Sequence, residues 1–174
     1  MNFEEQLAAG LEGVVVVMGI GNPLRGDDAA GSLAARRILG SQGVCVIDAQ
    51  DVPENYLLQV VNQHPDTIVL IDSVDLHSAP GSVAFLDRDQ LAEYWPSTHR
   101  MPIRMLMEIL DQETHARVIG IGIQPAHTEF LNPVSDAVAE SLARVADILN
   151  GALARGRRAT HGMPASSVES EVPA

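Results

Sequence analysis

Aspartates stand at the ends of three apolar segments of this sequence, and aspartate can bind a cation or transfer a proton. Asp48 ends VCVID, Asp72 ends IVLID, and the adjacent pair Asp27 and Asp28 follows the first apolar run within GIGNPLRGDDAAG. Each could instead cap a helix or close a turn. Acids gathered at one edge would repel one another, and a cation or a proton would relieve that repulsion. Because ligands bind outside the carboxyl ends of strands in open α/β sheets, this edge is the predicted site.

One histidine is placed to join these acids. His99 lies in STHRMP, among small polar residues and just before a segment with helical spacing, so we expect it to project from a loop. A surface or structural role is the alternative for a single histidine. The other histidines lack ligand spacing such as H-x-x-x-H and are interpreted as surface residues: His64, His77, His115, His127 and His161. Two carboxylates and an imidazole would suit a divalent ion such as Ni²⁺ or Zn²⁺.

The glycine-rich turn that leads to the aspartate pair also invites comparison with a dinucleotide-binding loop. Gly19 and Gly21 match the first two glycines of G-x-G-x-x-G, but Leu24 stands where the third belongs. Asp27 and Asp28 would also bring negative charge to the helix N-terminus that should receive a pyrophosphate. Nucleotide binding is therefore a minor alternative.

The segments that must position these side chains alternate between strand-like and helix-like patterns. Apolar runs typical of strands covered on both faces occur at 14–20, 44–48, 67–72 and 117–123, with a shorter run at 82–86. Helical spacing is found at 27–39, 53–63, 101–113 and 132–153, and a helical turn is possible at 88–95. Parallel strands need a crossover, which a helix supplies. The sequence therefore predicts a three-layer α/β/α fold with a twisted, mostly parallel sheet of about five strands, of which the short fourth runs antiparallel.

Composition limits the partners and the location. The 174 residues carry a formal net charge of −12, and binding to nucleic acid or to an anionic membrane needs a basic surface, so neither partner is predicted. No apolar run approaches ~20 residues and the start lacks a basic leader, so we expect a cytoplasmic protein. Residues 1–155 are predicted to form a single α/β domain, and the polar segment 156–174 a disordered tail. Cys45, within GVCVID, is predicted to be buried.

Several of these motifs, taken in order, resemble one family. GIGNPLRGDDAAG, VIDAQDVPEN, IVLIDSVD, STHRMPIRMLMEIL and GIQP follow the pattern of the nickel–iron hydrogenase maturation endopeptidases, from about Val14 to Ile148. THRMP makes the chain most similar to the group that processes the large subunit of formate-hydrogenlyase-type hydrogenases. The resemblance implies a cytoplasmic hydrolase, an aspartyl or metal-linked protease, that removes a C-terminal peptide from the nickel-loaded precursor of a [NiFe]-hydrogenase large subunit.

The resemblance also implies a set of site residues. In the family, an acid of the glycine-rich turn, an aspartate ending the third strand and a loop histidine meet in a cleft and can hold a metal ion. By motif position these are Asp28, Asp72 and His99, the expected catalytic residues and metal ligands, with Asp27 as a cap or support. Nickel is expected to be supplied by the substrate, so the resting enzyme need not hold metal. Family members often read D-D-G-x-G, and Ala29 in this chain means that a positive φ is not required there.

Another class of function would use the same surfaces. A non-catalytic, metal-dependent chaperone could bind the large subunit without cutting it. Within the endopeptidase reading, two mechanisms remain open at the level of sequence: the metal could polarise the scissile carbonyl, or a carboxylate could activate water while the metal marks the loaded precursor.

Overall fold

A single mixed sheet forms the centre of the computed structural model, which describes residues 1–87 and 101–161, without the side chains of 157–161. Within these residues the strands are β1 (Val15–Ile20), β2 (Val44–Gln50), β3 (Thr67–Ser73), β4 (Val83–Leu86) and β5 (Arg117–Ile123). Their spatial order is β2-β1-β3-β5-β4, all parallel except for β4, which pairs antiparallel with β5. The predicted fold class and the direction of the fourth strand are both confirmed.

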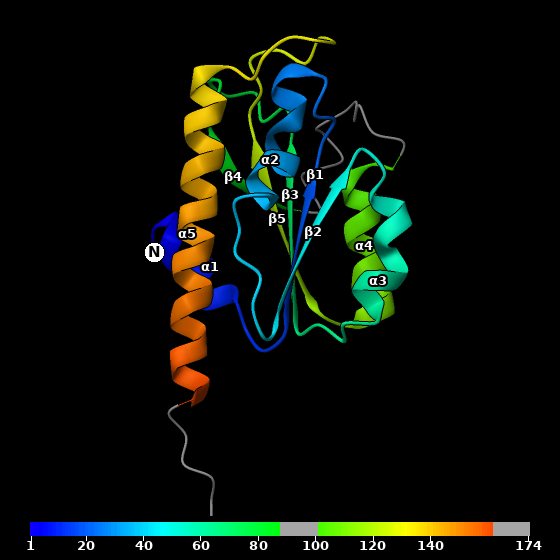
Figure 1. Cartoon of the computed structure of the whole chain (residues 1–174), viewed down its shortest axis with the longest axis vertical. Helices are drawn as coiled ribbons and strands as arrows, with labels where there is room; N and C mark the ends of the chain where they lie inside the picture. Colours follow the sequence, from blue (N-terminus) through cyan, green and yellow to red (C-terminus); the bar gives the residue numbers. More distant parts are fainter. Residues whose placement is uncertain (88–100, 162–174) are drawn as a thin grey trace, which may run out of the picture.

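Helices cover both faces of this sheet (Figure 1). One face carries α1 (Phe3–Gly10), α2 (Ala30–Ala35) and α5 (Asp136–His161), and the other carries α3 (Leu57–Val61) and α4 (Ile103–Thr114). Short 3-10 turns precede two of them, η1 (Gly26–Ala29) before α2 and η2 (Pro53–Tyr56) before α3. The predicted three-layer arrangement is therefore the observed one.

The apolar runs lack alternation because each strand contributes to two separate cores. Val15 and Val17 of β1 belong to the core under α2 and α5, whereas Val16 and Met18 belong to the core under α4. Residues of β3 divide in the same way, so side chains on both pleats are withdrawn from water. Burial on both faces is what selects a β-branched run without polar positions.

Close packing of α2 on the strands brings η1 to the carboxyl edge of the sheet. A Cβ added at Gly19 would lie 2.1 Å from the carbonyl oxygen of Gly31, and one added at Gly31 would lie 2.0 Å from that of Ile71. Neither position can accept a side chain, because real Cβ atoms do not approach backbone oxygen so closely. The glycines at 19 and 31 therefore set how near the turn between β1 and α2 lies to β3.

The structure has more helix at both ends of the domain than the sequence analysis predicts. The sequence analysis did not anticipate α1, which begins with a capping box: Asn2 Oδ1 accepts from the Glu5 amide, and Glu5 Oε2 accepts from the Asn2 amide, each at 2.9 Å. At the other end α5 continues to His161, six residues past the predicted domain boundary at 155, so the helix occupies the start of the predicted tail. The remainder of that tail, 162–174, and the predicted turn at 88–95 lie outside the described residues.

Cys45 is only half-buried, and it packs beside the core under α4. Burial raises the pKa of its thiol, which keeps the group in the neutral form at ordinary pH. Cys45 therefore lies in the predicted apolar environment, but it is less buried than predicted.

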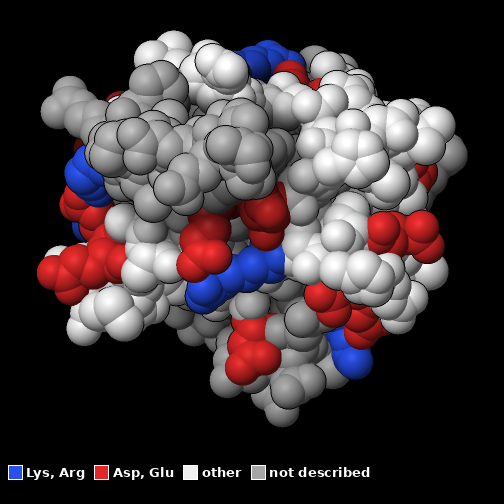
Figure 2. All heavy atoms as spheres, turned by 90° about the horizontal axis from the view of Figure 1, so that it is seen from below, with Lys and Arg blue, Asp and Glu red and all other residues white. Residues whose placement is uncertain are grey.

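Charged side chains are mixed on the face of the molecule at which the strands begin. Figure 2 shows acidic and basic groups interspersed on that face rather than gathered into a basic patch. Among the helices that the structure describes, none combines the length and the apolar character needed to cross a membrane.

Candidate active site

Two of the predicted site residues meet the same edge of the sheet. Gly19 of β1 lies opposite Ile71 of β3 in parallel register, so the two strands end level with each other. Asp72 follows Ile71 directly, and Asp28 lies in η1, which contacts β3. Both carboxylates are buried, each with 2% of its surface exposed. Burying an ionisable group is costly, so two such groups at one edge indicate a site rather than a solvated surface.

Backbone groups of the glycine-rich turn hold Asp28 in place. Its Oδ2 accepts a hydrogen bond from the Asn22 amide at 3.1 Å. Gly21, with φ at 144°, donates its own amide to the carbonyl of Gln50, and a Cβ at Gly21 would lie 1.9 Å from the Asp28 carbonyl oxygen. A side chain at position 21 would thus displace the turn that carries Asp28.

Ala29 and Gly26 show where this turn needs glycine and where it does not. Ala29 has φ at −71°, an ordinary right-handed value, so the replacement of the family's usual glycine leaves the backbone unstrained. The left-handed conformation occurs earlier, at Gly26, with φ at 52°. The departure from the family pattern at position 29 therefore has no consequence for the path of the turn.

Asp72 is positioned by the end of β3. Its Oδ1 accepts a hydrogen bond from the Ser73 amide at 2.8 Å. The segment that follows is held by Gln124, the glutamine of GIQP, whose Oε1 accepts from the amides of Leu76 at 2.6 Å and Ser78 at 3.3 Å. This buried glutamine holds the segment after β3, a role that the sequence analysis did not assign although it quoted the GIQP motif.

His99, the third predicted ligand, lies outside the described residues. Within residues 1–87 and 101–161, no three His, Cys, Asp or Glu side chains are grouped closely enough to hold a metal ion. Asp28 and Asp72 lie at the same edge of the sheet, and metal binding by these two acids together with His99 stays a prediction.

Asp27 has a different task from its neighbour. Fully buried, it joins the turn to a loop about a hundred residues away in the chain: Oδ2 accepts from the Ala126 amide at 2.7 Å and from Ser135 Oγ at 2.8 Å, and Oδ1 from the Ser135 amide at 2.6 Å. Burial acts to raise the pKa of Asp27, but the hydrogen bonds from Ser135, Ala126 and His127 outweigh it and hold that pKa below its usual value. Asp27 is thus a charged brace beneath the candidate site.

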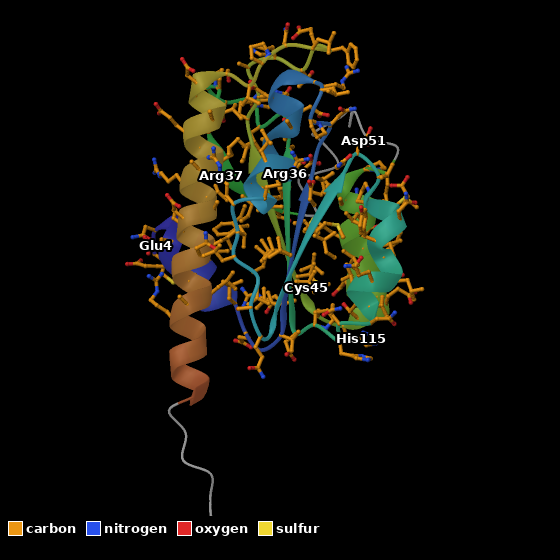
Figure 3. All side chains as sticks on the ribbon, viewed as in Figure 1. Glu4, Arg36, Arg37, Cys45, Asp51 and His115 are labelled. Carbon is orange, nitrogen blue, oxygen red and sulfur yellow. The ribbon has the colours of Figure 1, made fainter. Side chains whose placement is uncertain are left out.

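Asp48, the remaining strand-end acid, is engaged in a structural pair. Its Oδ2 accepts from Arg36 Nε and its Oδ1 from Ser32 Oγ, both at 2.7 Å. Both donors come from α2 or the residue that follows it, and Figure 3 labels Arg36 there. Arg36 neutralises Asp48 and fastens α2 to β2, so this acid fulfils the ordinary structural role that the sequence left open for it.

His127 is not a simple surface residue. Its ring lies against the turn that carries Asp28, where a Cβ added at Gly26 would be 2.8 Å from His127 Nδ1. Among the described residues, the buried side-chain atoms without a hydrogen-bond partner are Arg25 Nε, Glu54 Oε2 and His127 Nδ1, and two of these belong to or touch this turn. His127 Nδ1 also lies 3.9 Å from Glu129 Oε2, the carboxylate with which it can form an ion pair.

Comparisons with known proteins agree on one family. A family model described as hydrogenase maturation protease matches residues 30–152, which include Asp72 and the position of His99. The hydrogenase 3 maturation protease of Escherichia coli K12 is 30% identical over 139 residues, covering 78% of this chain and 88% of the relative.

Solved structures show the same likeness. The crystal structure of a [NiFe] hydrogenase maturation protease, HycI, from Thermococcus kodakarensis KOD1 superposes with a TM-score of 0.78 at 27% identity, covering 86% of this chain and 99% of that one. The solution structure of an endopeptidase HycI from Escherichia coli gives a TM-score of 0.69 at 28% identity, covering 91% and 99%. The likeness thus extends over nearly the whole of both related chains.

Proposed function

The chain belongs to the hydrogenase maturation protease family, and we propose that it removes a C-terminal peptide from the nickel-loaded precursor of a [NiFe]-hydrogenase large subunit. Membership of this family makes it a peptidase. The observation that carries the more detailed proposal is the pair of buried carboxylates, Asp28 and Asp72, at one edge of the sheet. A cytoplasmic location fits a precursor that is processed where it is made, and it stays a prediction.

A carboxylate at this edge can serve the hydrolysis of a peptide bond directly. In the proposed reaction, Asp28 or Asp72 accepts a proton from a water molecule as the water oxygen attacks the scissile carbonyl carbon. The C–N bond then breaks, and the proton is passed to the leaving nitrogen, which becomes the amino terminus of the released peptide. Burial of both acids supports this role, because it holds the two carboxylates in fixed positions at an edge from which bulk water is largely excluded.

Nickel enters this proposal as part of the substrate. Two carboxylates and an imidazole form a donor set that suits a divalent ion of this kind, and Asp28, Asp72 and His99 would supply it. The ion would bring a Lewis acid close to the scissile bond when the loaded precursor is bound. His99→Ala would remove the single nitrogen donor of the set, so we expect that variant to release no peptide.

Incubation of the protein with nickel-loaded precursor, followed by C-terminal mass analysis, tests the proposal. We expect release of one defined peptide, and no release from precursor prepared without nickel. The competing function, a chaperone that binds the large subunit without cutting it, predicts a complex and an unchanged precursor mass. Equal cleavage of loaded and nickel-free precursor would contradict the role given to nickel.

A further inference from the structure

Three large apolar side chains lie exposed at the same edge of the molecule as the candidate site. Leu24, Phe130 and Leu131 are 55%, 60% and 71% exposed, and we call them the apolar rim. Leu24 belongs to the turn that carries Asp28, and Phe130 and Leu131 belong to the segment after β5. The Leu131 amide donates to the Leu24 carbonyl at 2.7 Å, so the two segments lie side by side. Figure 1 shows the segment after β5 crossing the top of the molecule above α2.

Leu131 is held outward in a conformation that leucine rarely adopts. Its φ is 63°, in the left-handed region that glycine and asparagine accept far more readily. Next to it, the Asn132 side chain donates to Glu129 Oε2 at 3.3 Å and the Asn132 amide to the Glu129 carbonyl at 3.4 Å, which closes a tight turn around residues 130 and 131. A costly backbone conformation that exposes an apolar side chain is unfavourable for an isolated protein, and such strain is commonly kept for function.

The apolar rim is fastened to the candidate site. Gly26 donates its amide to the Asn132 carbonyl at 3.1 Å, and Asp27 donates its amide to the His127 carbonyl at 3.0 Å. The carboxylate of Asp27 accepts hydrogen bonds from both ends of the same segment, from the amides of Ala126 and Ser135. The segment therefore cannot shift without moving the turn on which Asp28 stands.

We propose that the apolar rim is a docking surface for the folded part of the hydrogenase large-subunit precursor, beside the C-terminal segment that is cut. The inference rests on the proposed function, which requires a protein substrate to approach Asp28. Leu24 and Asp28 belong to the same turn, and that turn is hydrogen-bonded to the segment that carries Leu131, so the rim lies next to the turn that bears the site acid. Apolar side chains set among polar ones are typical of the centre of a protein interface. On a chain with a net charge of −12, they offer contact that does not depend on the charge of the partner.

A double variant, Leu24→Gln/Leu131→Gln, tests the docking surface with Leu58→Gln as the matched control. Leu58 is also 71% exposed but lies on α3, away from the rim. We expect the double variant to raise both the Kd for nickel-loaded precursor and the KM of processing about ten-fold or more, with kcat within about two-fold. Leu58→Gln should leave all three unchanged. Leu131→Asn is a second variant that removes the same apolar side chain. Asparagine accepts the positive φ at this position more readily than leucine, so this variant should fold even if the double variant does not.

Two readouts separate this inference from the proposed function. If the parent protein binds precursor but releases no peptide, the peptidase proposal fails, and the Kd of the double variant still decides the role of the rim. If the double variant binds and processes precursor like Leu58→Gln, the docking surface is wrong and the peptidase proposal stands. Sedimentation of the parent and the double variant adds a third outcome: a dimer lost in the double variant, with KM unchanged, would assign the rim to a second copy of the chain and overturn the inference.

Discussion

The two ends of the sheet use acidic residues in opposite ways. At the end where strands begin, Asp66 is exposed, and its Oδ2 accepts from the Val14 amide at 2.7 Å, closing a connection between neighbouring segments. At the end where strands finish, Asp27, Asp28 and Asp72 are buried. An exposed acid costs little and stabilises a turn, whereas a buried acid must have its loss of hydration offset by fixed partners. The buried acids of the carboxyl edge are therefore expected to have specific roles: Asp27 braces the turn, and Asp28 and Asp72 are the candidates for chemistry.

Removing the charge of the site acids should have the largest effect. We expect Asp28→Asn and Asp72→Asn each to reduce the rate of peptide release at least about a hundred-fold, because each amide retains the shape but loses the basic and cation-binding oxygen. Asp66→Asn, at the opposite end, is the control and should process at the parent rate. Single-turnover processing of nickel-loaded precursor, followed by mass analysis, provides the measurement. Parent-like rates in both site variants would remove the distinction between the two ends.

Loss of the brace should reduce stability instead. Asp27→Asn replaces an acceptor-only group with an amide, so at least one of the amide donors of Ala126 and Ser135 faces a donor. We expect the free energy of unfolding to fall by about 2–4 kcal/mol, against less than about 1 kcal/mol for Asp66→Asn. Urea denaturation of both variants measures the difference. Similar losses in the two would show that burial at the carboxyl edge adds nothing to the role of Asp27.

The pH dependence of stability should show the same contrast. The folded-state pKa of Asp27 lies below its ordinary value, so the stabilisation that its ionised form contributes is fully present above the unfolded-state pKa of about 4. That stabilisation is lost as pH falls below about 4 towards the lower folded-state pKa. The parent should therefore lose more stability on acidification than Asp27→Asn does. Parallel unfolding curves for the two proteins over this range would contradict the prediction.

Much of the fold could be predicted from the sequence because burial on both faces leaves a plain signal. The strands were predicted within about two residues, and the apolar runs that reveal them are the same residues that fill the two cores. The helix α1 was missed although Asn2 and Glu5 form a recognisable capping box. The last helix was predicted to end at residue 153, but α5 continues to His161, because the helix passes through Gly151 without stopping there.

The site was less predictable, because identical residues serve different tasks. Asp27 and Asp28 are adjacent and chemically alike, yet one turn of η1 directs the first to Ser135 and the second to Asn22. Ser135, the partner of Asp27, is 108 residues away in the chain, so no local sequence pattern could predict the contact. Asp48 shared the strand-end position of Asp72, and only the packing of α2 brought Arg36 to it. Position along a strand thus predicts the edge that a side chain reaches but not the partner that it meets there.

The smallest expected effect concerns Ala29, where the chain departs from the family's usual glycine. Ala29 is buried with φ at −71°, so glycine would adopt the same backbone while adding freedom to the unfolded chain. We expect Ala29→Gly to lower the free energy of unfolding by about 0.5–1 kcal/mol and to leave processing unchanged. Gly26→Ala is the matched opposite: its φ is 52° and its added Cβ would lie 2.8 Å from His127 Nδ1, so it should cost more stability and slow peptide release. Urea denaturation and processing assays on both variants would locate where this turn depends on glycine. Faster processing in Ala29→Gly would show instead that the substrate backbone approaches position 29, and that the alanine limits its access.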